Sequence, residues 1–267
     1  MSFSIEGKTA IVTGAANGVG LAIARHFVNQ GANVMFADMD EARLYHECGE
    51  VIEEDGNIRY FAGDLRERLT LANLLSATID AFDRVDILVN GSRQVLRSDP
   101  LDLDDTTLEA LIMQNVTNTF RLSQMVAKRM IKQAADKEEG QVGAIVNLSS
   151  IAARRTQPEL LGFSVSMAAL DQVTRSLAVS LAEHRIRVNS VALGSVMSAS
   201  LSLSLKEHDE YRKEIEDNTP LGRIASPAEL AQAVQFLASE SSGFITGQIM
   251  TVDGGRTLID PVCAPAH

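Results

Sequence analysis

A glycine-rich turn after the first apolar segment has residue types that suit the binding of phosphate. The segment Thr9–Val12 is followed by TGAANGVG at residues 13–20, where a helical pattern begins. Glycines allow a tight turn and a close approach of backbone to pyrophosphate, while the first N–H groups of a helix point at the anion. The residues expected to bind a dinucleotide at this turn are Gly14, Asn17, Gly18, Val19 and Gly20.

An acidic residue at the end of the second apolar segment bears on the choice of dinucleotide. Asp38 follows Asn33–Ala37, and a carboxylate at this position can accept hydrogen bonds from both hydroxyls of an adenosine ribose. A 2′-phosphate would meet like charge there, and no Arg or Lys lies beside Asp38 or in the turn. The sequence therefore predicts NAD(H) rather than NADP(H), with an ordinary strand-end acid as the alternative interpretation of Asp38.

Short apolar segments alternate with longer amphipathic segments along the whole chain. The apolar segments are rich in Val and Ile and mostly lack alternation, which is typical of strands buried on both faces. The candidate strands are Thr9–Val12, Asn33–Ala37, Ile58–Phe61, Ile87–Val89, Ala144–Leu148, Arg187–Leu193 and Ile249–Val252. The candidate helices are Val19–Gln30, Asp40–Glu54, Leu69–Phe82, Thr107–Lys132, Phe163–Glu183 and Pro227–Leu237. This order predicts an α/β fold with a single Rossmann-like, doubly wound parallel sheet of about seven strands and helices on both faces.

One late segment interrupts this alternation. In Ser195–Glu216, Leu and Ser alternate as far as Leu205, and a charged stretch follows. Ligands of such sheets bind outside the carboxyl ends of the strands, so we expect a substrate lid around residues 195–220, with a surface excursion as the alternative. Residues 260–267 lack periodicity and predict an irregular tail, and we expect residues 1–267 to form one dinucleotide-binding domain of the oxidoreductase type.

With these features in view, the chain resembles the short-chain dehydrogenase/reductase family over nearly its whole length. The TGxxxGxG spacing of the turn matches, and Asn90 matches the first residue of the family's NNAG stretch. Residues 187–192 resemble the sixth strand, although Leu193 stands where Pro is usual, and residues 245–248 and 252–255 resemble the closing strand. The resemblance implies that further cofactor contacts come from Asp64, Leu65, Asn90, Gly91, Gly194 and Val196, the first two of them at the adenine.

The resemblance also implies a reaction centre, and there the chain departs from the family pattern. The family transfers hydride between a carbonyl–alcohol pair and NAD(P), with a serine at the substrate oxygen, a tyrosine that moves the proton, a lysine that lowers the pKa of the tyrosine, and an asparagine that anchors a water chain. Ser150 and Asn115 occupy two of these four positions. Phe163, thirteen residues after the serine, occupies the tyrosine position, and Met167 occupies the lysine position.

The loss of both groups is physically coherent. A tyrosine has an unperturbed pKa of about 10 and works near neutrality only beside positive charge. Without the phenol, a lysine would still bear desolvation, whereas Met fills the gap with an apolar chain and Phe preserves the ring packing. Neither Phe163 nor Met167 can carry a proton, so the catalytic positions are retained without their chemistry.

Other departures surround this centre. Arg93 stands where NNAG has its glycine, and Asn118 replaces a glycine of the long helix. Arg154 and Arg155 follow Ser150 into a cleft-side loop, where solvated loop charge and an anion or oxyanion site are alternative interpretations. Tyr211 is either a substitute acid on the lid or a surface tyrosine.

The composition argues against several classes of function. The net charge of −11 disfavours nucleic acid and anionic membranes, because both need a basic surface. No apolar segment approaches the roughly 20 residues that span a bilayer, and the chain opens directly into a strand, so we expect a cytoplasmic protein. Cys48 and Cys263 lie far apart and are expected to be reduced thiols. No cluster of residues has metal-ligand spacing, so no metal is expected.

Two functions fit these observations. The first is an NAD(H)-dependent oxidoreductase with a modified proton relay, acting on a small, partly apolar alcohol or ketone, since Met197, Leu201, Leu203 and Leu205 lie in the lid segment. The second is a non-catalytic dinucleotide sensor or a structural partner of an active homologue. By resemblance, a homodimer or homotetramer is expected through the two long helices beside the reaction centre.

Overall fold

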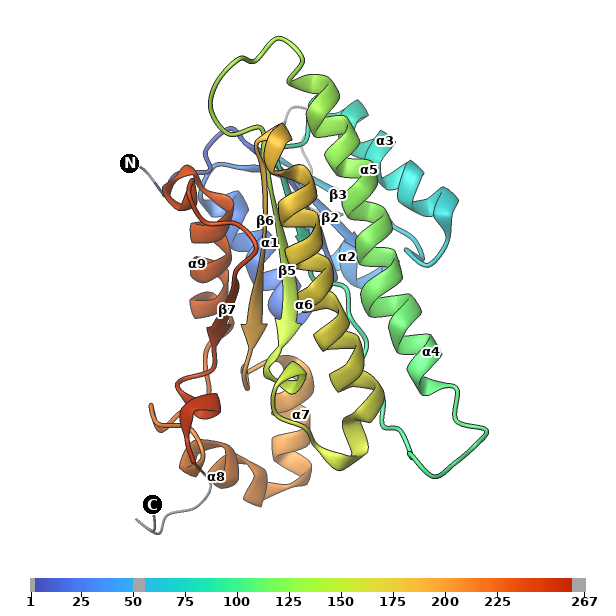
Figure 1. The fold of residues 1–267 in the computed structure, drawn as a ribbon, viewed down its shortest axis with the longest axis vertical. Helices are drawn as coiled ribbons and strands as arrows, with labels where there is room; N and C mark the ends of the chain where they lie inside the picture. The colour runs from blue at the N-terminus through green and yellow to red at the C-terminus, as the bar shows by residue number, and fades with distance from the viewer. Residues whose placement is uncertain (1–2, 50–55, 261–267) are drawn as a thin grey trace.

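The computed structural model describes residues 3–49 and 56–260, which contain one parallel sheet (Figure 1). Its seven strands have the order β3-β2-β1-β4-β5-β6-β7. They are β1 (Thr9–Thr13), β2 (Asn33–Asp38), β3 (Ile58–Ala62), β4 (Ile87–Asn90), β5 (Gly143–Ser150), β6 (Ile186–Leu193) and β7 (Ile249–Val252). The chain moves outward from β1 to β3 and then returns to add β4 on the other side of β1. This reversal places a switch point between β1 and β4, which is where ligands of such sheets bind.

Helices cover both faces of the sheet (Figure 1). One face carries α1 (Gly18–Asn29), α2 (Glu41–Cys48) and α9 (Pro227–Ala238). The other carries α3 (Arg68–Phe82), α5 (Asn118–Gln133) and α6 (Leu161–Leu181). Side chains of successive strand residues point to opposite faces. In β1, Ala10 and Val12 accordingly join the core under α1, whereas Ile11 joins the core under α5. The predicted α/β class and doubly wound sheet are confirmed.

The long predicted helix Thr107–Lys132 is wrong as a continuous α-helix. It consists of α4 (Thr107–Leu111), the π-helix η2 (Ile112–Thr117) and α5. The π-helix changes which side chains face α6, and such turns occur frequently at functional sites. The predicted helix Asp40–Glu54 corresponds to α2, which ends at Cys48, and residues 50–55 lie outside the described residues. Residues 261–267 of the predicted tail, with Cys263, also lie outside them.

The predicted lid segment contains two helices, α7 (Ala199–Glu207) and α8 (Asp209–Asp217). Both lie beyond the arrowheads of β5 and β6, over the carboxyl edge of the sheet (Figure 1). The 3-10 helices of the described residues are η3 (Ile151–Ala153), η4 (Pro158–Leu160), η5 (Ala182–His184), η6 (Glu240–Ser242) and η7 (Arg256–Leu258).

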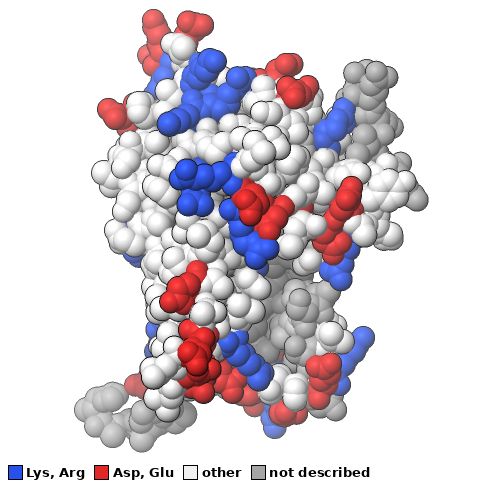
Figure 2. All heavy atoms as spheres, turned by 90° about the vertical axis from the view of Figure 1, so that its right-hand side faces the viewer, with Lys and Arg blue, Asp and Glu red and all other residues white. Residues whose placement is uncertain are grey.

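The described surface is mixed in charge. Figure 2 shows acidic and basic side chains interspersed on one face, with uncharged areas between them. Within the part of the chain that the structure describes, no helix combines the length and the apolar character needed to cross a membrane.

Candidate functional site

The glycine-rich turn joins β1 to α1 at the switch point, and its glycines have different roles. A Cβ on Gly20 would lie 2.1 Å from the Gly14 carbonyl oxygen, and a Cβ on Gly14 would lie 2.8 Å from backbone atoms of Gly91. Both glycines are therefore required where backbone packs against backbone. Gly18 has a φ of +57°, and a Cβ there would meet only Ser198 Cβ, at 3.8 Å. Gly18 thus presents the open surface of the turn.

Thr13 holds this turn against the loop after β4, a role that was not predicted from the sequence. Its hydroxyl oxygen accepts hydrogen bonds from the N–H groups of Gly91 at 3.0 Å and Ser92 at 3.1 Å. A threonine at the end of a strand carries no distinctive sequence signal, so only the structure identifies this contact. It keeps the two sides of the switch point together.

The start of α1 suits a phosphate group. Asn17 is the N-cap residue, and its side chain makes no capping hydrogen bond. The first N–H groups of the helix therefore lack a side-chain acceptor, and an anion is the group that such an end stabilises. With the open surface at Gly18, these features fit the pyrophosphate of a dinucleotide.

Asp38 lies beside the same turn. One of its carboxylate oxygens accepts a hydrogen bond from the Ala16 N–H at 3.1 Å, and the other accepts one from the Asp40 N–H at 3.2 Å. Arg43, the cation in the following turn, pairs with Asp40 at 3.3 Å. Among the ion pairs of residues 3–49 and 56–260, none includes Asp38, so its negative charge is not offset there.

The residues after β3 and β4 are largely engaged within the protein. Asp64 pairs with Arg66 at 2.6 Å, and hydrogen bonds from Arg66 hold the pKa of Asp64 below its usual value. Leu65 is buried under α3. The Asn90 amide donates to Ser123 Oγ at 3.1 Å and to the Asn147 side-chain oxygen at 2.8 Å. The Asn90 side chain thus ties β4 to β5 and α5, which leaves its backbone and that of Gly91 at the edge of the site.

The loop after β6 is fixed against β7 and the start of α9. A Cβ on Gly194 would lie 2.8 Å from Asp253 Cα, and the Gly194 N–H donates to the Val252 carbonyl oxygen at 3.0 Å. Val196 is buried and pairs with Ala225 in a parallel bridge. Glycine is therefore required at position 194 for the close approach of two strand ends.

A cleft of about 440 Å³ lies at the carboxyl edge, between the loop after β5 and α8. Its lining includes Ser150, Phe163, Gly194 and Tyr211. The Ser150 hydroxyl oxygen accepts a hydrogen bond from the Ala152 N–H at 3.1 Å, so its proton remains available to donate to a ligand. The predicted substrate serine and the predicted nicotinamide loop therefore share one cleft.

The proton-relay positions are packed rather than polar. Phe163, which lines the cleft, and the fully buried Met167 belong to an apolar cluster with Leu111 and Leu170. The Asn115 side-chain oxygen accepts from the Gln94 N–H at 2.8 Å, and its amide donates to the Gln94 carbonyl at 3.0 Å and to Ser166 Oγ at 3.1 Å. The Asn115 side chain thus forms its hydrogen bonds within the protein. No titratable group stands at position 163 or 167.

The other polar departures lie in different places. Arg93 is half-buried beside the end of β5, where it donates to the Ser149 carbonyl at 3.2 Å and where desolvation lowers its pKa. Both polar atoms of the buried Asn118 amide lack a hydrogen-bond partner. Arg155 lines the cleft, whereas Arg154 bonds Thr251 Oγ1 at 2.9 Å and does not line it. Of these two neighbouring arginines, only Arg155 is therefore placed to contact a ligand in the cleft.

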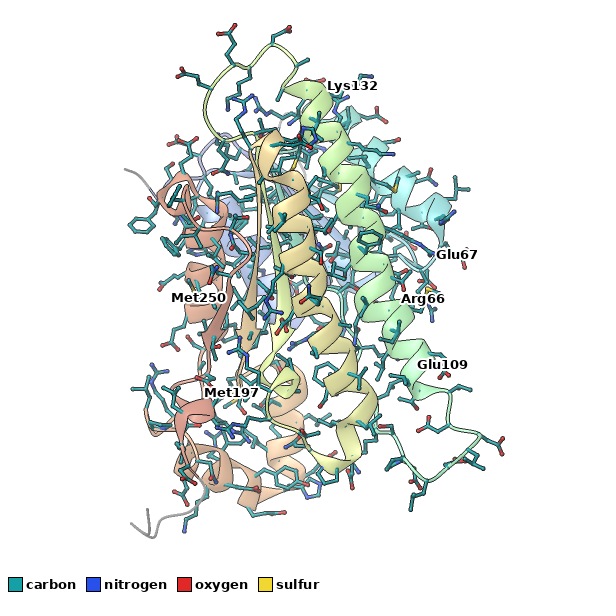
Figure 3. All side chains as sticks on the ribbon, viewed as in Figure 1. Arg66, Glu67, Glu109, Lys132, Met197 and Met250 are labelled. Carbon is teal, nitrogen blue, oxygen red and sulfur yellow. The ribbon has the colours of Figure 1, made fainter. Side chains whose placement is uncertain are left out.

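The predicted lid segment contributes only one of the expected residues to the cleft. Met197, labelled beyond the end of β6 in Figure 3, does not line the cleft, and neither do Leu201, Leu203 and Leu205. The apolar lining instead comes from Ile151, Ala152, Leu160, Phe163, Leu193 and Ile215. Tyr211 does line the cleft, and its ring stacks on that of His208 at 4.5 Å between centroids. The four side chains that motivated the prediction of a partly apolar substrate thus lie outside the cleft lining, which has apolar walls of its own.

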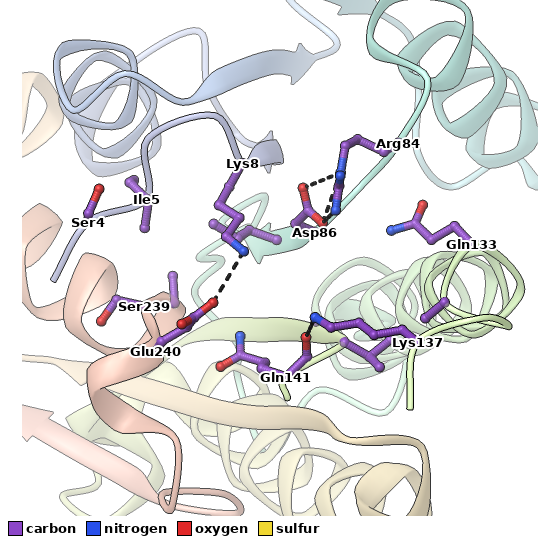
Figure 4. Close-up of a pocket in the computed structure, with 15 residues that line it drawn as sticks. Ser4, Ile5, Lys8, Arg84, Asp86, Gln133, Lys137, Gln141, Ser239 and Glu240 are labelled. Carbon is purple, nitrogen blue, oxygen red and sulfur yellow. Dashed lines mark hydrogen bonds and ion pairs between the residues drawn. The ribbon is translucent and has the colours of Figure 1, made fainter. Parts of the chain in front are cut away.

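Features away from the cleft do not form a second centre. A smaller hollow of about 60 Å³ lies at the opposite, amino edge of the sheet (Figure 4). Two ion pairs lie in its lining, Lys8 with Glu240 at 3.4 Å and Arg84 with Asp86 at 2.7 Å. Lys137 donates to the Gln141 carbonyl oxygen. Cys48 is free, and burial raises the pKa of its thiol to about 11. Across the described residues, no three His, Cys, Asp or Glu side chains are grouped to hold a metal ion.

Comparison with known proteins agrees with this arrangement. The sequence profile of a family described as enoyl-(acyl carrier protein) reductase matches residues 14–257. Galactitol 2-dehydrogenase (L-tagatose-forming) from Cereibacter sphaeroides is 34% identical over 96% of this chain and 97% of its own length. The chain belongs to the short-chain dehydrogenase/reductase family. A second member, a 3-oxoacyl-[acyl-carrier-protein] reductase from Thermotoga maritima, is 30% identical over 95% of this chain and 99% of its own length.

A solved structure agrees with the family assignment. This chain matches the crystal structure of a putative gluconate dehydrogenase from Agrobacterium tumefaciens with a TM-score of 0.87 and 26% sequence identity. The match covers 97% of this chain and 99% of the other protein. Short-chain dehydrogenases/reductases bind NAD(P), and members of the family such as the two relatives named above act on small-molecule substrates. The family to which the chain belongs is therefore a family of oxidoreductases.

Proposed function

We propose that this chain is an NAD(H)-binding oxidoreductase for a carbonyl–alcohol pair that turns over slowly because its proton relay is missing. The observation that carries the proposal is one cleft that holds Ser150 and the Gly194 loop beside Phe163, with Met167 sealed in an apolar cluster. Bound nicotinamide supplies or accepts the hydride. The chain supplies the pocket, the hydrogen bond and the exclusion of water.

Ser150 can donate a hydrogen bond to the substrate oxygen, which positions the carbonyl and polarises it. Its hydroxyl is too weak an acid to replace a tyrosine held beside a lysine. Losing a positioned general acid commonly costs about 10²–10⁴ in rate. Orientation of the reactants by the cleft still favours hydride transfer, so a slow reaction survives.

Tyr211 is the phenol that lines this cleft, and it supports one alternative route for the proton. It lies on α8, and 36% of its surface is exposed. A Tyr211→Phe variant of the native chain would lose its remaining turnover if the phenol carries the proton. Unchanged turnover would assign proton delivery to water.

The preference for NAD(H) is supported by Asp38, whose carboxylate faces the turn without a cationic partner. A 2′-phosphate at this position would meet its negative charge. We expect NADH to bind more tightly than NADPH, by roughly tenfold or more for one unfavourable charge contact. Tighter binding of NADPH would contradict the assignment.

A second candidate function is a non-catalytic dinucleotide sensor or a structural partner of an active homologue. The observation that favours it is the hydrogen bonding of the Asn115 side chain within the protein. Its side-chain oxygen accepts from the Gln94 N–H, and its amide donates to Gln94 and to Ser166 Oγ, so both amide donors are used within the protein. Under this function the cofactor binds and no substrate reacts.

One experiment separates these functions. NADH is titrated into the full chain by fluorescence, and carbonyl and alcohol substrates are then tested on the native chain and on Phe163→Tyr/Met167→Lys. The first function predicts slow native turnover that rises by about 10²–10⁴ in the double variant. Turnover in the double variant alone would support the second, and native turnover as fast as that of the double variant would refute a missing relay. Absence of NADH binding would overturn both. Each single variant serves as a control, since neither restores the pair.

A further inference from the structure

Two arginine side chains from distant parts of the sequence line the substrate cleft. Arg155, in the loop after β5, donates to the carbonyl oxygen of Thr257. Arg256, the neighbour of Thr257 in η7, donates to Ser195 Oγ at 3.0 Å. Both arginines line the cleft that contains Ser150. Two cations therefore line the cleft where a substrate would lie.

Neither guanidinium group has an acidic partner among the side chains that the structure describes. Among the described side chains, no Asp or Glu lies within the 4.0 Å ion-pair distance of Arg155 or Arg256. The chain has 35 acidic and only 24 basic residues, so carboxylates are plentiful. The nearby Asp253 carboxylate instead accepts hydrogen bonds from the N–H groups of Gly255 and Thr257. The two guanidinium groups therefore keep N–H donors that no ion pair among the described side chains uses.

The walls between these cations and Ser150 are apolar. Ile151, Leu160 and Phe163 line the same cleft, as does Ile215 from α8. An occupant that matches these surfaces has a charged end, a hydrocarbon portion and an oxygen at the reacting carbon. A carboxylate fits the planar guanidinium fork better than a neutral polar group because it can accept paired, charge-assisted hydrogen bonds.

We propose that the cleft binds an anionic substrate, a hydroxy or oxo acid whose carboxylate contacts Arg155 and Arg256 while its alcohol or carbonyl oxygen faces Ser150. This inference deepens the proposed function and rests on it, because the cleft is the same. It names the substrate class, which neither the fold nor the family determines.

Glu214 gives the proposal a second test of opposite sign. It is the acidic residue in the described lining, and it lies beyond ion-pair distance of both guanidinium groups. Its negative charge opposes an incoming carboxylate across the cleft. Glu214→Gln is therefore expected to tighten the binding of anions and to leave that of neutral analogues unchanged.

The experiment measures the binding of hexanoate and of hexanamide to the full chain by calorimetry, with and without saturating NADH. The two probes differ in charge and hardly in shape. We expect hexanoate to bind at least tenfold more tightly, and Arg155→Gln and Arg256→Gln each to weaken it by roughly tenfold, the effect of one charge-assisted hydrogen bond. Arg154→Gln is the matched control, since Arg154 lies in the same loop outside the cleft lining.

Equal binding of the two probes, or an equal loss in Arg154→Gln and Arg155→Gln, would overturn the proposal. Higher salt should weaken only hexanoate, because it screens charge. If Arg256→Gln fails to fold, Arg155→Gln and Glu214→Gln still decide the question. If the native chain does not bind NADH, the proposed function is refuted. If it binds NADH but binds hexanoate and hexanamide equally, only the proposal of an anionic substrate is refuted.

Discussion

Gly18 is the residue at which coenzyme binding can be separated from folding. Its φ of +57° lies in the left-handed region, which Asn also adopts, and no backbone atom would meet a Cβ there. Gly18→Asn should therefore retain the fold while its side chain covers the open surface of the turn. We expect NADH affinity to fall at least tenfold in fluorescence titration, the size of one lost polar contact.

The control for this variant is Gly140→Asn. Gly140 also has a positive φ, +78°, and lies in the loop that precedes β5 at the opposite edge of the sheet. Both substitutions should shift the unfolding midpoint equally, and only Gly18→Asn should affect NADH. Unchanged NADH affinity in Gly18→Asn would move the coenzyme away from this turn.

Asp171 is a buried carboxyl in α6 that the proposed reaction does not use. Burial raises its pKa above the usual value, and Ser149, Arg154 and Arg175 oppose that shift only in part. One of its oxygens has no hydrogen-bond partner. The unfolded chain therefore loses this proton at lower pH than the folded chain, so ionisation destabilises the fold above the ordinary Asp pKa of about 3.9.

We accordingly predict that Asp171→Asn raises the thermal unfolding midpoint at pH 7. The gain should shrink as the pH falls towards 4, because the native carboxyl then becomes neutral as well. Differential scanning calorimetry across this range measures the effect, with the exposed Asp136→Asn as control. A gain that stays constant with pH would show that charge is not its cause.

For single residues, sequence patterns predict which positions lie at the site better than they predict which contacts those residues make. The family resemblance, with its interval of thirteen residues, predicted Ser150 and Phe163 at one site, and both line the same cleft. No pattern could predict that Asn115 would bond the backbone of Gln94, because that contact depends on how two loops pack. The split between Arg154 and Arg155 was equally hidden, since neighbouring residues of an irregular loop point in unrelated directions.

Among the elements, the start of α9 links stability to the site. Ser226 and Glu229 form a capping box, in which the Ser226 N–H donates to the Glu229 carboxylate at 2.8 Å. The residue before the cap, Ala225, pairs with Val196 in the loop after β6. The cap therefore fixes both the helix and the loop that carries Gly194.

Ser226→Ala should lower the free energy of unfolding by about 1 kcal/mol, since it removes the hydroxyl acceptor at the N-cap. Urea denaturation measures the change. Ser226→Asp retains an acceptor and serves as the matched variant, with a smaller expected loss. Equal losses in the two variants would show that capping by the side chain contributes nothing here.

The buried strands were predictable almost to the residue, because an apolar segment between turns has few alternatives. The strand predicted at Ile87–Val89 extends only one residue further, to Asn90. Helices α7 and α8 were not predicted, since the Leu–Ser alternation up to Leu205 has a period of two, which is not helical. The π-helix at Ile112–Thr117 was missed because one wider turn leaves the surrounding helical pattern intact.

The whole molecule leaves an apolar groove on its outer surface. A hollow of about 390 Å³ lies between α5 and α6, lined by Phe120, Val173 and Leu177 among others. Val179, also on α6, is 80% exposed. Apolar surface of this kind marks sites of association. It supports the prediction, from the family resemblance, of a homodimer or homotetramer in which these two helices pack against their symmetry mates.

Phe120→Glu should convert the assembly to a monomer, because each charge would be buried against the partner's apolar surface. Light scattering after gel filtration measures the mass. Leu103→Glu is the control, since Leu103 is 99% exposed in a loop outside the groove. A native chain that is already monomeric, or a Phe120→Glu variant with the same mass as the native assembly, would refute this interface.

The contact of Gly20 with Gly14 at the β1–α1 junction has an evolutionary consequence. Any larger residue at position 20 would collide with the main chain, so mutations there are removed whether or not the protein still has a ligand. A lineage that abandoned its coenzyme would keep most of this glycine fingerprint for as long as it kept the fold. Genome surveys that count nucleotide-binding proteins by such fingerprints will therefore include retired members, and position 18 is where genetic drift should first reveal them.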